Sequence, residues 1–228
     1  MIQEMIALSV KQMYPLTSKI LRFWFGVAET SARIEKKPEW FRSTEAHDSI
    51  IKSRFSDVQI KASLGELDYL KNYPEGCLAL ILLLDQFPRH IFRNSPKAFE
   101  TDTKAREVAL SAIKSNYHTY YGDWQRIFCY LPFEHSECIK DHNFIIPFFS
   151  KLNKDKFYNT QKTAIDHMKV IQRFGRYPHR NAILCRKNTQ EEEKYLMNPP
   201  YWGMTKTQVQ TTKEKIRKIP KKLSKTNK

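Results

Sequence analysis

Residues 74–86 read PEGCLALILLLDQ, and this stretch decides the fold. Pro74 suits the first turn of a helix, where an amide hydrogen is not needed. The eight residues from Cys77 to Leu84 are all apolar, so the helix has no face that favours water. We therefore predict a central buried helix that continues to about Gln86. Pro88 is expected to end it, because the proline ring clashes with the carbonyl group four residues earlier.

Apolar residues at helical spacing continue on both sides of this segment. Ser43, Thr101 or Asp102, Ser136 and the capping box at Thr189 are the expected helix starts. No stretch alternates apolar and polar residues between turns, so strands are not supported. The sequence therefore predicts an all-α fold, an antiparallel bundle or array of eight or nine helices joined by short loops. Besides 74–86, the expected helices lie near residues 20–25, 43–58, 66–70, 101–116, 123–131, 136–152, 157–174 and 189 onward.

The 228 residues, 41% of them hydrophobic, suffice for one sizeable core. We expect a single helical domain over residues 1–202. Residues 203–228 contain nine Lys or Arg and one acid, which is about half of the net charge of +15. Because hydrophobic residues become rare there, we expect a disordered basic tail or at most a frayed helix. Its charge favours acidic partners, including nucleic acid.

Cellular location is predicted from the cysteines and the apolar runs. Cys77, Cys129, Cys138 and Cys185 form no C-x-x-C pair, which indicates reduced thiols lining the core of a cytoplasmic protein. The longest apolar run has eight residues, whereas a membrane span needs roughly 20. The first ten residues lack the basic start and the cleavage site of a signal peptide.

The first of three polar clusters follows the apolar stretch directly. Asp85 and Gln86 come next along the chain, and Arg89 and Arg93 lie four and eight residues beyond Asp85. A buried carboxylate is costly without a cation or a donor to compensate it. One interpretation is a structural Asp–Arg pair that fixes the bend at Pro88. The other is a cleft lined by Asp85, Gln86 and Arg89.

The second cluster comprises residues 134–137, which read EHSE. Pro132 is expected to break the preceding helix, so that Ser136 caps the next one and Glu137 sits at its positive end. Alternatively, His135 beside carboxylates is a general base or a metal ligand.

The third cluster brings four arginines into fourteen residues. They repel one another unless an anion or buried carboxylates neutralise them, and arginine forks suit carboxylate or phosphate. The neighbouring cations lower the pKa of His179 and favour its neutral form. A solvated basic loop is the alternative. If Asp85, Glu134 or Glu137 compensates the arginines, the three clusters form one site. The cluster consists of Arg173, Arg176, His179, Arg180, Asn181 and Arg186.

Five sequence blocks resemble one bacterial family, the domain of unknown function numbered 924. They are FWFG at 23–26, WF at 40–41, LLDQFPRHIFR at 83–93, LPFEHSE at 131–137 and RFGRYPHRNAIL at 173–184. The resemblance implies a tetratricopeptide-like helical fold and no established activity. Two positions depart from the family pattern, which usually has Asn in place of His90 and Gly in place of Cys185.

We therefore predict a helical binding protein with one internal pocket for a small anionic ligand or an acidic peptide end. One alternative is a hydrolase-type enzyme with His135 or His179 as general base, and Glu137 as a further catalytic candidate. Another is an RNA-associated protein acting through the tail. Nucleotide-binding, H-E-x-x-H and zinc-finger motifs are absent, so no metal or cofactor is expected. The ligand and the oligomeric state stay open. The predicted pocket comprises Asp85, Gln86, Arg89, Arg93, His135, Glu137, Arg173, Arg176, His179, Arg180, Asn181 and Arg186.

Overall fold

The computed structural model describes the backbone of residues 15–218 and the side chains as far as Glu214. Every regular element in these residues is helical, which confirms the all-α prediction. The α-helices are α2 (Pro15–Phe25), α3 (Glu45–Leu64), α4 (Pro74–Ile81), α5 (Phe87–Ile91), α6 (Asp102–Lys114), α7 (Asp123–Glu134), α8 (Ile139–Ser150), α9 (Lys154–Phe174), α10 (Gln190–Leu196) and α11 (Lys206–Lys218).

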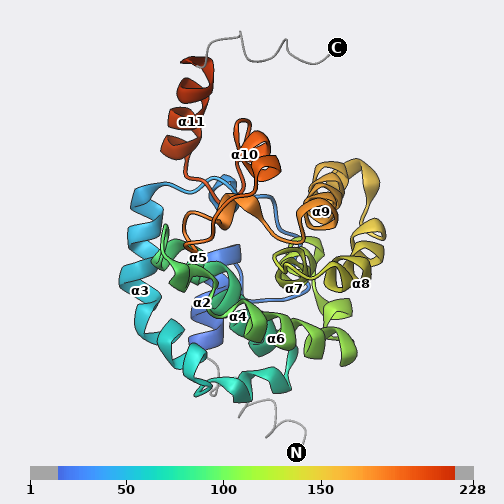
Figure 1. Cartoon of the computed structure of the whole chain (residues 1–228). Helices are drawn as coiled ribbons and strands as arrows, with labels where there is room; N and C mark the ends of the chain where they lie inside the picture. The colour runs from blue at the N-terminus through green and yellow to red at the C-terminus, as the bar shows by residue number, and fades with distance from the viewer. Residues whose placement is uncertain (1–14, 219–228) are drawn as a thin grey trace, which may run out of the picture.

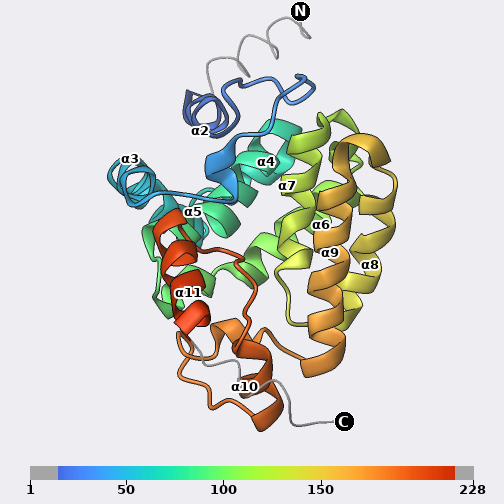
Figure 2. The same cartoon turned by 90° about the horizontal axis from the view of Figure 1, so that it is seen from above.

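Helix α4 lies at the centre, as its composition predicts (Figure 1). It packs against α2, α6 and α7, and all its residues from Gly76 onward are buried. Helices α6, α7, α8 and α9 lie side by side on one flank, and α3 lies on the other (Figure 2). Aromatic rings join the two parts, since the Trp24 ring lies 5.5 Å from the rings of both Phe87 and Phe128. Burying side chains of this size contributes roughly 1.5–3 kcal/mol each.

Pro88 does not end the central helix, and that prediction is wrong. Residues Leu82–Gln86 form a turn of π-helix, in which the Phe87 amide donates to the Leu82 carbonyl. Pro88 then lies in the first turn of α5, where its missing amide is tolerated. The carbonyl four residues before Pro88, that of Leu84, accepts a hydrogen bond from the Thr101 hydroxyl at 2.5 Å. The helix therefore bends and continues, because a residue from another element replaces the lost bond.

Three further helix boundaries differ from those predicted. Thr44, not Ser43, caps α3 by accepting the amide of His47 at 3.2 Å. Pro132 lies inside α7, which continues to Glu134, because proline fits helical φ and removes only one backbone bond. Ser136 precedes α8 by three residues and bonds the Cys138 amide, so it is not the helix cap.

The segment after residue 202 is folded as far as the structure describes it. Of the two predicted states, a disordered tail or a frayed helix, the helical one is nearer, since residues 206–218 form α11. Thr205 is 1% exposed, and its hydroxyl lies 3.1 Å from a carboxylate oxygen of Glu45. The Lys206 amide donates to the Ser43 carbonyl at 3.1 Å. These contacts dock the start of α11 on α3, and sequence composition does not reveal them. Residues 219–228 of the predicted tail lie outside the described residues.

The cysteines divide into two kinds. All four are free thiols; Cys77 and Cys129 are buried as expected, whereas Cys138 and Cys185 are exposed. Cys138 lies at the surface because it precedes the first turn of α8. None of the helices in the described residues is long and apolar enough to cross a membrane.

Candidate functional site

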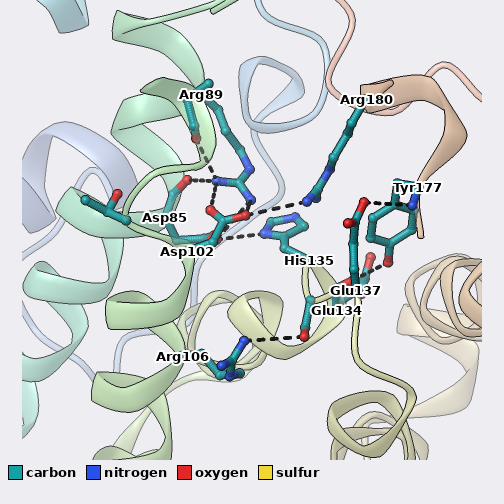
Figure 3. Close-up of polar contacts among 12 residues, drawn as sticks. Asp85, Arg89, Asp102, Arg106, Glu134, His135, Glu137, Tyr177 and Arg180 are labelled. Carbon is teal, nitrogen blue, oxygen red and sulfur yellow. Dashed lines mark hydrogen bonds and ion pairs between the residues drawn. The ribbon is translucent and has the colours of Figure 1, made fainter. Parts of the chain in front are cut away.

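The three predicted clusters meet beside the bend of the central helix (Figure 3). The buried Asp85 lies in the π-turn, and its carboxylate is 2.8 Å from Nδ1 of His135 at the end of α7. Arg89, on α5, forms two bonds of 2.9 and 3.1 Å with Asp102 at the start of α6. Arg180 enters from the turn at residues 178–180 and lies 3.6 Å from the same Asp102 carboxylate.

Asp85 is fully buried and charged. Burial opposes ionisation, but Arg89 and His135 together hold the pKa of Asp85 below its ordinary value. Arg89 lies 3.4 Å from this carboxylate, as predicted for a pair four residues apart, and also donates to the Asp85 backbone carbonyl at 2.6 Å. The Gln86 amide donates to the other carboxylate oxygen. The Asp–Arg pair at the bend is therefore present, and it also supports His135.

His135 is held in one tautomer by Asp85. An ionised carboxylate only accepts hydrogen bonds, so Nδ1 of His135 must carry the hydrogen. Burial lowers the pKa of His135 despite the nearby Asp85, which favours the neutral ring at neutral pH. Nε2 is then the nitrogen left to accept a bond from a ligand.

Arg180 is a buried guanidinium with too few partners. It is 7% exposed and lies between the rings of Phe99 and Tyr177, 4.7 and 4.6 Å from their centres. Among the described residues, its one ion pair is with Asp102, and Arg89 already engages both oxygens of that carboxylate. Its Nε is buried without a hydrogen-bond partner among the described residues. Burial accordingly lowers the pKa of Arg180.

Two neighbouring cavities of about 400 and 440 Å³ adjoin this network. The first lies toward residues 36–43 and α9, and the second toward Phe99, Arg180 and α11. The segment that joins α10 to α11 runs between α5 and α9 (Figure 2) and contributes to both cavities. The shared lining residues are Arg89, Arg93, His135, His167, Trp202, Gly203 and Met204.

Half of the predicted pocket residues line these cavities and half do not. Asp85 lies behind the lining and supports it. Asn181 is fully buried and bonds Asn188 and Arg186, so its role is local structure. Those that line a cavity are Gln86, Arg89, Arg93, His135, His179 and Arg180. Those that line neither are Asp85, Glu137, Arg173, Arg176, Asn181 and Arg186.

Carboxylates neutralise three of the four arginines in the third cluster, which is one of the two alternatives that the sequence left open. Arg173 pairs with Glu191 at 2.7 Å, Arg176 with Glu192 at 2.6 Å, and Arg186 with Glu137 at 2.7 Å. Glu191 and Glu192 come from the first turn of α10, which folds back onto the cluster. Glu137 therefore holds Arg186 and does not cap α8.

His179 lines the second cavity, as predicted. Burial, assisted by the charge of Arg180, lowers the pKa of His179 to about 3. The sequence predicts a lowered pKa and a neutral His179 from neighbouring cations. The pKa is lowered as predicted, but burial contributes more than the cations do. Its Nδ1 is buried and has no hydrogen-bond partner among the described residues, so no carboxylate orients this ring.

Several residues of the site were not predicted from the sequence. The sequence indicates only a helix cap at Asp102, whereas its carboxylate links Arg89 to Arg180. Nδ1 of His167, on α9, lies 3.1 Å from Glu134, and its ring stacks on Trp202 with 3.6 Å between ring centres. Burial, with the charge of Asp85, raises the pKa of Glu134 to about 8. No spacing in the sequence connects these residues, because each comes from a different helix or loop.

The fold and the site define a helical domain with a buried carboxylate–histidine–arginine network beside two cavities. Residues 20–200 match the family model described as bacterial protein of unknown function (DUF924), and the chain belongs to this family. The resemblance seen in the sequence blocks is thus confirmed.

A solved structure of a protein of unknown function from Agrobacterium tumefaciens is similar to this chain. The two are 38% identical with a TM-score of 0.64, and the match covers 69% of this chain and 88% of the other. A search of curated proteins finds no match. In the described residues, no group of three or more His, Cys, Asp or Glu side chains is arranged to hold a metal ion.

Proposed function

We propose that this protein binds a small anionic ligand in the second cavity and that Arg180 is its principal ligand-binding residue. The observation that carries this proposal is the incomplete pairing of Arg180. It is a buried cation that shares one carboxylate with Arg89 and has an unpartnered Nε. Removing a guanidinium from water is unfavourable unless charged hydrogen bonds replace the hydration.

A carboxylate or phosphate would supply these bonds, because its oxygens match the guanidinium fork. The cavity volume of about 440 Å³ lies in the range typical of small-molecule sites. Thr207, Gln208 and Thr211 of α11 add hydroxyl and amide groups to its lining. The terminal carboxylate of an acidic peptide presents the same chemistry and belongs to the same proposal.

The test is a thermal-shift series with phosphate, sulfate, nucleotides and small dicarboxylates at matched ionic strength. A ligand at 100 times its dissociation constant stabilises by about 2.7 kcal/mol, a shift of roughly 5–10 °C for a domain of this size. Arg180→Met should abolish the response without lowering the midpoint, since it removes an undercompensated buried charge. Arg173→Met is the matched control, because Arg173 is exposed and paired with Glu191. The proposal fails if no anion exceeds chloride, or if Arg180→Met responds like the wild type.

A second candidate function is acid–base catalysis with His135 as general base. It is favoured by the contact of Nδ1 with the buried Asp85 carboxylate at 2.8 Å, which orients the ring and leaves Nε2 for a substrate. His179 lacks such a carboxylate. The test is hydrolysis of carboxylic and phosphoric ester substrates by wild type, His135→Gln and Asp85→Asn. Activity that survives His135→Gln unchanged would exclude this role.

Association with RNA through the basic segment 203–228 stays a prediction, as do the cytoplasmic location, the single domain over residues 1–202 and the tetratricopeptide-like arrangement.

A further inference from the structure

Three histidines around the cavities share one arrangement. Nδ1 of each lies against a carboxylate: His90 against Asp48 at 2.7 Å, His135 against Asp85 at 2.8 Å, and His167 against Glu134 at 3.1 Å. All three rings line the first cavity, and those of His135 and His167 also line the second.

This arrangement fixes which ring nitrogen faces a ligand as an acceptor. The carboxylates of Asp48 and Asp85 accept from Nδ1, so His90 and His135 carry their hydrogens there. His167 is fixed in the same tautomer, because its Nδ1 donates to the Thr163 carbonyl at 2.9 Å. Burial lowers the pKa of each histidine, which keeps the rings neutral and leaves a lone pair on Nε2.

Gln86 adds a fourth acceptor to the first cavity. Its amide nitrogen donates to Asp85, which leaves its amide oxygen for other partners. Within the described residues, no protein donor reaches this oxygen or Nε2 of the three histidines. These acceptors are open to the cavities and are not sealed in the interior, so a ligand that carries hydrogen-bond donors can pair with them.

We propose that the ligand is a hydroxylated anion, either a hydroxy acid or a sugar phosphate. This inference rests on the proposed anion site at Arg180. The anionic group lies on Arg180 in the second cavity, and hydroxyl groups donate to Nε2 of His135 and His167, which line the same cavity. Hydroxyl donors fit better than ammonium groups, because Arg89, Arg93 and Arg180 also line the cavity and repel cations.

The experiment is isothermal titration with two series of anions that carry increasing numbers of hydroxyl groups. Succinate, malate and tartrate form the carboxylate series, and inorganic phosphate, glycerol phosphate and glucose phosphate form the phosphate series. Each hydroxyl that reaches a histidine should strengthen binding roughly three- to tenfold, the range expected of a neutral hydrogen bond. The series with the larger gain identifies the anionic group.

His167→Phe tests whether the hydroxyl preference comes from the site. Phenylalanine retains the stack on Trp202 and removes Nε2, so the preference should shrink while binding of the plain anion persists. His118→Phe is the matched control, because His118 lines neither cavity. Thermal midpoints of both variants establish that they fold.

Two results would overturn the inference and leave the anion site standing: no gain in binding with added hydroxyl groups in either series, or a hydroxyl preference unchanged by His167→Phe. If no anion binds the wild type, the anion site and this inference both fail.

Discussion

The buried Glu134 predicts an unusual dependence of stability on pH. Glu134 is 4% exposed, no Lys or Arg of the described residues lies at ion-pair distance from it, and its nearest charged-type partner is the neutral imidazole of His167. Burial therefore raises the pKa of Glu134 to about 8, and the negative charge of Asp85 adds to the shift. At pH 7 the folded protein holds this proton. The unfolded chain, with an ordinary glutamate, has released it.

Proton linkage determines the sign and the size of the pH effect of Glu134 on the free energy of unfolding. Because the folded state binds more protons, raising the pH from the ordinary glutamate pKa to about 8 lowers the free energy of unfolding. The slope is about 1.4 kcal/mol per pH unit while the folded state stays protonated. Between pH 7 and 8, where ionisation of the folded state begins, the loss is about 1 kcal/mol, or roughly 2–4 °C in the thermal midpoint.

The assay compares wild type with Glu134→Gln by urea unfolding at pH 7 and pH 8. Glutamine resembles the protonated acid, so the variant should lose about 1 kcal/mol less over this interval than the wild type. The histidines do not interfere, because wild type and Glu134→Gln contain the same histidines and their contributions cancel in the comparison. Glu191→Gln, at an exposed pair with Arg173, is the control and should follow the wild type. Equal losses in wild type and Glu134→Gln would refute the raised pKa.

Two other substitutions test the backbone of the fold. Cys185→Gly should raise the free energy of unfolding by about 1 kcal/mol, because Cys185 has φ of +53°, which costs a non-glycine residue energy. Cys185→Ala is the control and should gain nothing; equal midpoints of the glycine and alanine variants would contradict the strain. Thr101→Val should lower the free energy of unfolding by roughly 1–3 kcal/mol, because the Leu84 carbonyl loses the donor that the Thr101 hydroxyl provides. Thr101→Ser should restore most of that loss in urea unfolding, and a neutral Thr101→Val would show that the bend needs no such bond.

The helical fold could be predicted because its signals are local. The apolar run in α4 makes that helix central whatever surrounds it. The capping box at Thr189 starts α10, as expected. The prediction that Pro88 ends the helix is wrong because it considers only the neighbouring turn of the same helix. The Thr101 hydroxyl that compensates it comes from the start of another helix.

The candidate site could be predicted only where partners are close in sequence. Asp85 and Arg89 are one helical turn apart, so their pairing follows from spacing. The partners of Arg173 and Arg176 could not be found, because they lie on α10 beyond a loop whose path no sequence pattern gives. The docking of α11 could not be predicted for the same reason, since Glu45 is 160 residues from Thr205.

The protonated state of Glu134 connects the stability of the site with its proposed ligand. Asp85 and Asp102 balance the charges of Arg89 and Arg180 as long as Glu134 is neutral. An anion that binds Arg180 adds negative charge to this balanced group. Ionisation of Glu134 would add a further negative charge, in a buried environment where screening by water is weak. Burial of Glu134 thus removes a charge that would oppose the ligand, and anion binding should weaken once the pH exceeds the pKa of this carboxyl, about 8.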